Sequence, residues 1–171
     1  ENIARALAFE SIVRCASERL SKQTGERFSS AYSRIRNFGF GLASITVEDA
    51  THLQTILRGL RIVDPAVGSG ALLLAAFDVL MRLFLKCREI RGSLIRSGSQ
   101  DWIDTAEHFL RECLFGVDID PHAIEIAKLR LCLALTVGSE APRPLPDLSY
   151  NIRLGDSLSE FREAINFKQI E

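Results

Sequence analysis

Apolar residues recur at helical spacing near the N-terminus of this chain, which predicts helices there. Farther along, short apolar segments alternate with stretches of helical spacing, which predicts a mixture of strands and helices. Residues 3–20 carry apolar side chains at helical spacing, and a polar start predicts a second helix over residues 46–58. Residues 21–44 contain three glycines and several serines, so we expect a long loop or short irregular pieces there. Residues 1–59 are therefore predicted to form an N-terminal helical segment.

Beyond residue 59, short apolar segments alternate with longer segments of helical period. We expect strands over residues 60–63, 113–117 and 150–154, helices over about 69–85, 101–111, 121–136 and 160–166, and polar connections over 86–100 and 141–146. Strands that alternate with helices predict an α/β fold, with a parallel sheet that has helices on both faces. The carboxyl ends of the strands then lie along one edge, where such sheets bind ligands.

The composition is that of an ordinary globular domain, with 171 residues, 47% hydrophobic, 25% charged, and 21 basic against 22 acidic residues for a net charge of −1. This balance excludes a largely disordered chain and a polybasic nucleic-acid-binding protein. The longest apolar stretch, residues 71–85, is shorter than the roughly 20 residues of a membrane span, and no signal peptide is visible. We therefore expect no membrane partner. The four cysteines lack metal-binding spacing and nothing suggests disulfides, so we expect no metal site and a cytoplasmic protein in a reducing environment.

The first predicted strand leads into a turn that suits an anionic ligand group. Gly68 and Gly70 let the backbone approach a ligand closely, and the following helix offers unpaired N–H groups to a carboxylate or phosphate. Asp64, just before them, suits an ammonium group. The third position of a dinucleotide-binding fingerprint is Leu73 rather than glycine, so a tight strand-to-helix turn without a ligand remains the alternative.

Acidic residues also follow the second and third predicted strands. Asp118 suits two hydrogen bonds from a ribose diol, and Ile119 suits the face of a purine. Asp156 suits an exocyclic amine, and Ser157 supplies a hydroxyl. The alternatives are a solvated loop aspartate at the second strand and a helix N-cap at the third, whereas Asp120 is explained by capping of the next helix. Places for an amino acid, a ribose and an adenine match the three parts of S-adenosylmethionine.

Three stretches at these turns resemble the motifs of a known family. Residues 64–73, Asp-Pro-Ala-Val-Gly-Ser-Gly-Ala-Leu-Leu, resemble the first motif of DNA adenine-N6 methyltransferases, and residues 115–131 and 145–158 are similar to the second and third. Residues 126–130 resemble those of the Eco57I-like, type IIG restriction–modification group. The resemblance implies a Rossmann-like class I methyltransferase fold over residues 60–171, with S-adenosylmethionine as the cofactor. The residues that we expect to bind it are Asp64, Ala66, Gly68, Gly70, Asp118, Ile119, Asp156 and Ser157.

The catalytic motif of that family, Asn/Asp-Pro-Pro-Tyr/Phe, is absent, because no two of the five prolines adjoin. We therefore expect no catalytic residue here, and interpret the chain as the cofactor-binding front half of a longer enzyme, cut at both ends, with an insertion at about residues 86–111. For the complete protein the resemblance implies methyl transfer to N6 of an adenine flipped out of double-stranded DNA, with fused or separate nuclease and specificity domains. The alternatives are a methyltransferase for RNA, protein or a small molecule, and a non-catalytic nucleotide-binding module.

Two runs of basic residues have no role in this interpretation. The first consists of Lys22, Arg27, Arg34 and Arg36, and the second of Arg82, Lys86, Arg88, Arg91 and Arg96. Either run could contact phosphate, although such runs are more often solvated faces.

Overall fold

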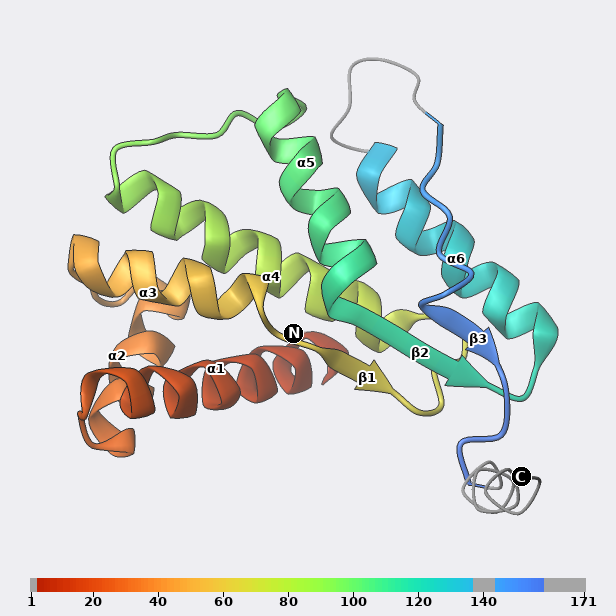
Figure 1. The fold of residues 1–171 in the computed structure, drawn as a ribbon, viewed down its shortest axis with the longest axis horizontal. Helices are drawn as coiled ribbons and strands as arrows, with labels where there is room; N and C mark the ends of the chain where they lie inside the picture. The colour runs from red at the N-terminus through yellow and green to blue at the C-terminus, as the bar shows by residue number, and fades with distance from the viewer. Residues whose placement is uncertain (1–2, 137–143, 159–171) are drawn as a thin grey trace, which may run out of the picture.

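The structure is a computed structural model that describes residues 3–136 and 144–158, so the helix expected at 160–166 and part of the connection expected at 141–146 lie outside it. The elements in these ranges are shown in Figure 1. In chain order they are α1 (Ile3–Thr24), α2 (Phe28–Phe40), α3 (Val47–Arg58), β1 (Ile62–Asp64), α4 (Ala71–Ile90), α5 (Gln100–His108), a π-helical turn (Phe109–Cys113), β2 (Leu114–Asp118), α6 (Pro121–Thr136) and β3 (Ile152–Leu154).

The three strands form one parallel sheet, as the alternation of strands and helices predicts. β2 lies in the centre and pairs with β1 on one side and β3 on the other. The register places Gly116 between Asp64 and Ile152. All three strands therefore end at the same edge, and the α/β class is confirmed.

Helices α4 and α6 cover one face of this sheet. Helix α4 contacts β1 and β2, α6 contacts β2 and β3, and the two helices contact each other (Figure 1). Asp64, Leu114 and Ile152 point to this side and are buried, whereas Val63, on the other side, is 62% exposed. The prediction of helices on both faces is thus wrong for the described ranges. Both crossovers advance in the same direction to the next strand, and crossovers of one hand then place both helices on the same side.

The N-terminal helices pack against α4 and share one hydrophobic core with the sheet. Helices α1 and α3 both contact α4, and α2 contacts α1. Buried apolar residues from all four helices and from the strands form a single cluster. The start of α3 is as predicted, because the Thr46 hydroxyl accepts a hydrogen bond from the Asp49 N–H at 3.0 Å.

The expectation of a loop over residues 21–44 is wrong, because α1 and α2 occupy most of that stretch. Ala31, Ile35 and Phe38 lie on one face of α2 and are buried. Gly39 permits close packing rather than a break, since a Cβ there would lie 2.6 Å from the ring of Phe9. The helix ends at Gly41, whose φ of 77° is the left-handed conformation that glycine favours.

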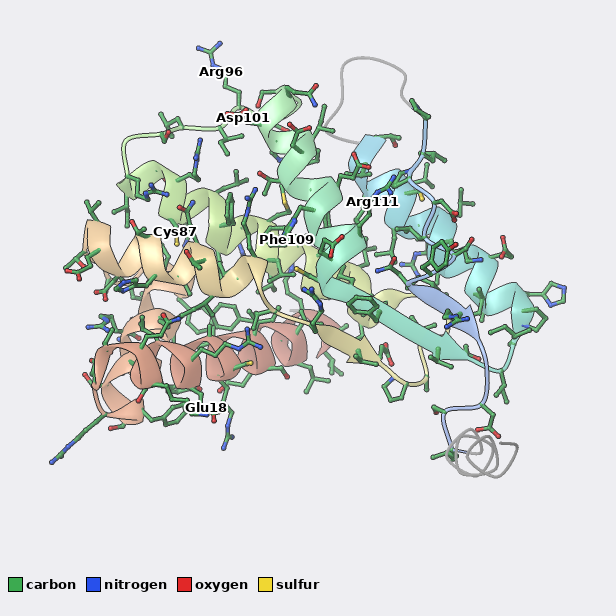
Figure 2. The ribbon with its side chains drawn as sticks, in the orientation of Figure 1. Glu18, Cys87, Arg96, Asp101, Phe109 and Arg111 are labelled. Carbon is green, nitrogen blue, oxygen red and sulfur yellow. The ribbon has the colours of Figure 1, made fainter. Side chains whose placement is uncertain are left out.

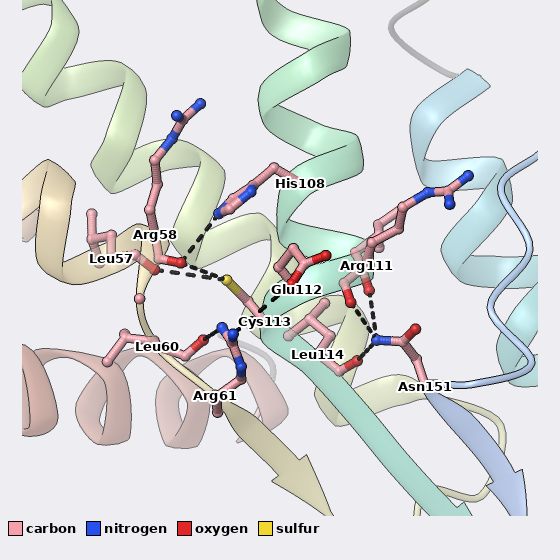
Figure 3. A network of polar contacts seen from close by, with 12 residues as sticks. Leu57, Arg58, Leu60, Arg61, His108, Arg111, Glu112, Cys113, Leu114 and Asn151 are labelled. Atoms are coloured by element: carbon pink, nitrogen blue, oxygen red, sulfur yellow. Dashed lines mark hydrogen bonds and ion pairs between the residues drawn. The ribbon is translucent and has the colours of Figure 1, made fainter.

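The expected insertion at 86–111 is more helical than its polar composition indicates. Helix α4 continues to Ile90, and the buried Cys87 anchors its last turns, so the connection predicted to begin at residue 86 starts later. Helix α5 then passes through the π-helical turn directly into β2. The buried Asn151 amide donates to the carbonyl oxygens of Arg111 at 2.7 Å and Leu114 at 3.0 Å (Figure 3). It satisfies carbonyls that the irregular turn leaves without regular partners.

No helix within the described ranges is long and apolar enough to cross a membrane.

Candidate functional site

Hydrogen bonds join the three turns at the carboxyl ends of the strands. The N–H of Val67, after β1, donates to the carbonyl of Val117 at 3.0 Å, and the N–H of Gly155, after β3, donates to the carbonyl of Asp118 at 2.9 Å. The N–H of Gly68 donates to Oδ2 of Asp118 at 2.7 Å. The structure therefore brings the three predicted segments together, with Asp118 bonded to both of the others.

The two glycines of the first turn have different surroundings. Both adopt positive φ, 50° at Gly68 and 80° at Gly70. A Cβ on Gly70 would lie 3.1 Å from Cβ and 3.2 Å from Cα of Ala127, so this glycine lets the turn pack against α6. A Cβ on Gly68 would meet no atom of the described chain within 4 Å. Gly70 thus serves packing, and Gly68 leaves open space in front of the first turn of α4.

Asp64 is buried, with 8% of its surface exposed, at the end of β1. Its Oδ1 accepts a hydrogen bond from the N–H of Ala66 at 3.2 Å, which shapes the turn. Its Oδ2 has no hydrogen-bond partner in the described part of the chain. A carboxylate that is held in place and keeps one oxygen available suits a cationic ligand group.

Asp118 is held by backbone N–H groups on both of its oxygens. Oδ1 accepts from the N–H of Asp120 at 3.0 Å, and Oδ2 accepts from Gly68. These two N–H groups hold the pKa of the Asp118 carboxyl below its usual value, because they stabilise the charged form. A carboxylate offers about four lone-pair positions, so about two remain for further donors such as a diol.

The other predicted residues lie at the same edge. Ile119 is 73% exposed, which leaves its side chain accessible to a ligand. Asp156 and Ser157 are exposed beyond β3, and Oδ1 of Asp156 accepts from the N–H of Leu158 at 2.9 Å. Asp120 caps α6, as predicted, because its Oδ1 accepts from the N–H of the second helical residue at 2.9 Å.

Two residues that support the site have no role in the sequence-based interpretation. A Cβ on Gly116 would lie 2.8 Å from Cγ2 of Val67, so only glycine at this point of β2 lets the first turn pack onto the sheet. Arg130 of α6 donates to the carbonyl and hydroxyl oxygens of Ser69, at 3.0 and 2.9 Å, and fixes the same turn. Glycine inside a strand was an available signal for the first. Arg130 lies in the stretch 126–130 that carries the resemblance, but nothing in the sequence assigns it this contact with Ser69.

Within the described ranges, no group of three or more His, Cys, Asp or Glu residues could hold a metal ion. The four cysteines are free thiols, with Cys15 exposed and the other three buried.

Comparison with known proteins gives one informative similarity. Over 120 residues, or 67% of this chain, the sequence is 38% identical to a protein of Methanocaldococcus jannaschii that bears the provisional name of a type II restriction enzyme and methyltransferase. The chain spans about 10% of the length of that relative. No family model matches the sequence, and no solved structure matches it significantly.

Proposed function

We propose that this chain is the S-adenosylmethionine-binding portion of a DNA methyltransferase from a restriction–modification system, and that the complete enzyme methylates N6 of adenine. The observation that carries the proposal is the meeting of the three turns at Asp118, through its bonds to Gly68 and Gly155. The name of the similar M. jannaschii protein, a restriction enzyme and methyltransferase, supports the restriction–modification setting and DNA as the partner.

The residues at the strand ends fit the three parts of S-adenosylmethionine. The open space at Gly68, next to the N-terminal end of α4, suits the carboxylate, and the available oxygen of Asp64 suits the ammonium group. The remaining lone pairs of Asp118 suit the ribose hydroxyls. We assign Ile119, Asp156 and Ser157 to the adenine, and Ala66 and Gly70 to the wall beside the amino-acid part. The cofactor supplies a methyl group on a positively charged sulfur.

The assignment of adenine N6 rests on the resemblance of residues 64–73 to the first motif of that family. Because the sequence contains no Asn/Asp-Pro-Pro-Tyr/Phe motif, we propose that this chain binds the cofactor but transfers no methyl group by itself. The catalytic, nuclease and specificity parts would belong to other regions of the complete protein or to separate subunits.

Calorimetric titration of the 171-residue chain with S-adenosylmethionine tests the site. Asp118→Asn removes the charge but keeps one acceptor oxygen, and it should weaken binding at least roughly tenfold, the effect of losing one charge-assisted hydrogen bond. Asp120→Asn is the matched control, because it makes the same charge change two residues away and asparagine caps helices about as well as aspartate. Thermal unfolding of both variants checks that they fold.

Equal affinities of wild type and Asp118→Asn, or equal losses in the two variants, would contradict the proposed site. Preference for ATP over S-adenosylmethionine would favour the nucleotide-binding module instead. Adenine as the target is tested on the complete enzyme, by digestion of DNA labelled from methyl-tritiated cofactor. Label in N6-methyladenine is the expected result, and label in cytosine or RNA would contradict that assignment.

A further inference from the structure

A polar cavity of about 410 Å³ lies at the far end of α4 from the glycine turn, between α3, the last turns of α4 and the start of α5. Its lining carries more positive than negative charge. The charged residues that line it are Arg58, Arg88, Arg91, Asp101 and Asp104. The side-chain amide of Gln54 and the hydroxyls of Thr51, Thr55 and Thr105 complete its polar surface.

The three arginines are held in position but keep most of their donors unused. Arg91 donates to the side-chain oxygen of the buried Gln54. The guanidinium carbon of Arg58 lies 5.3 Å from the ring centre of Phe84. Nε of Arg88 is buried and has no hydrogen-bond partner among the described residues. A buried donor without a partner destabilises the folded state, so a ligand that supplies an acceptor to this Nε–H group would bind favourably.

The cavity walls supply few acceptors for these donors. Oδ2 of Asp101 forms an ion pair with Nη2 of Arg88 at 3.8 Å, which is too long for a hydrogen bond, and the Asp101 side chain is exposed. Oδ1 of Asp104 already accepts from Gln100. The threonine hydroxyls donate to carbonyl oxygens of their own helices. The arginines therefore face a space that their neighbours do not fill with acceptors.

We propose that this cavity binds a phosphate group, with Arg88 and Arg91 as the main ligands and Arg58 as the third. Guanidinium groups bind phosphate oxygens through paired N–H donors. A tetrahedral phosphate presents oxygens on several sides, which suits arginines that approach from α3 and from α4, whereas a carboxylate presents only two. This site is separate from the strand ends, so it goes beyond the proposed cofactor-binding function and does not depend on it.

The structure also divides the second basic run, which the sequence shows as continuous. Only Arg88 and Arg91 of that run line the cavity. The ammonium group of Lys86 is occupied by the carbonyl oxygens of Phe38 and Gly39, at 3.2 and 3.0 Å. Arg96 is exposed and projects away from the helices (Figure 2). Arg96 is thus a natural control for charge that is nearby in sequence but outside the site.

Titration of the 171-residue chain with inorganic phosphate, followed by the NMR signals of the arginine Nε–H groups, tests the proposal. We expect a saturable shift of the Arg88 signal. Arg88→Gln and Arg91→Gln should each weaken phosphate binding at least roughly tenfold, as expected for loss of a charge-assisted contact, and Arg96→Gln should change it less than roughly twofold. The two variants inside the cavity provide independent tests if one of them fails to fold.

A shift that does not saturate, or an equal loss of affinity in Arg96→Gln, would overturn the site, since either result indicates only a general response to charge. Binding of S-adenosylmethionine should be the same in Arg88→Gln as in the wild type, so the two proposed sites fail independently.

Free phosphate compounds and the backbone of DNA present the same group, and competition separates them. A short DNA duplex that displaces inorganic phosphate, and binds more weakly to Arg88→Gln, would identify a contact to the DNA backbone, with the steep salt dependence of such contacts. Saturable phosphate binding without competition by the duplex would identify a small phosphate compound. Both outcomes support a phosphate site, and they assign it to different ligands.

Discussion

Alanine in place of each glycine of the first turn separates backbone strain from packing. Gly68 and Gly70 both have positive φ, and a left-handed conformation costs an alanine about 1–2 kcal/mol. Reduced freedom of the unfolded chain offsets about 0.4–1 kcal/mol of that cost. Gly68→Ala has no other cost, because its Cβ would meet nothing within 4 Å, so we expect a loss of about 1 kcal/mol in the free energy of unfolding.

Gly70→Ala should cost more, because its Cβ would lie 3.1 and 3.2 Å from Cβ and Cα of Ala127. One of these atoms is backbone in the middle of α6, which cannot move aside as the end of a flexible side chain can. Overpacking of this kind costs about 1–3 kcal/mol, which brings the expected loss for Gly70→Ala to about 2–4 kcal/mol.

Urea unfolding followed by circular dichroism measures both losses, with similar m-values as the check that the unfolding transition is unchanged. Ala127→Gly in the Gly70→Ala background removes the nearest atom, so the double variant should lose less than the sum of the single variants by about 1 kcal/mol. The loss of affinity for S-adenosylmethionine should rank in the opposite order. Gly68→Ala should weaken binding more than Gly70→Ala, because its added methyl group enters the proposed ligand space. Equal stabilities of Gly68→Ala and Gly70→Ala, without coupling to Ala127, would refute the packing argument.

Two further predictions follow from ionisable groups. The N–H groups of Asp120 and Gly68 lower the pKa of Asp118 from its ordinary 3.8 in the folded state, so the stability from these bonds is present above that value and is lost as the pH falls through the lowered pKa. Acid unfolding followed by circular dichroism should show this loss, and Asp118→Asn should remove that part of the pH dependence. Burial raises the pKa of Cys87 to about 12 and of Cys113 to about 11, whereas Cys15 is exposed. Dithionitrobenzoate should therefore react with one thiol of the folded chain and with all four in urea, and a higher count before unfolding would contradict the described burial.

The strand–turn–helix units could be predicted because several local signals agree at each of them. A short apolar segment gives way to apolar residues at helical spacing after the glycine turn, and Asp120 followed by Pro121 marks the start of α6. Thr46 and Asp49 mark the start of α3 in the same way. Since each signal acts within a few residues, no distant contact is needed to interpret it.

The features that were missed depend on contacts between distant residues. From the sequence, Gly39 looks like a loop glycine. In the structure it lies inside a helix, where the ring of Phe9 leaves no room for a Cβ. The placement of α4 and α6 on the same face depends on the direction of two crossovers, which the sequence does not encode locally. In the site, the three predicted turns are joined by hydrogen bonds, but the bond between Gly68 and Asp118 and the contact of Arg130 with Ser69 were visible only in three dimensions.

In the part of the chain that the structure describes, one face of the sheet is not covered by helices, and both outer strands are short, so we expect local unfolding to be easiest in the sheet. β1 and β3 have three residues each and are edge strands in the described ranges, and Val63, which points to the uncovered side, is 62% exposed. Amide protons there can exchange with solvent through small local openings, whereas those of α1 and α4 lie in the helical core and need far larger ones. A molecule that touched all three strand ends would bind only the closed arrangement, and its binding free energy would protect the sheet from exchange. Under the proposed function, S-adenosylmethionine would then stabilise the sheet as well as donate its methyl group.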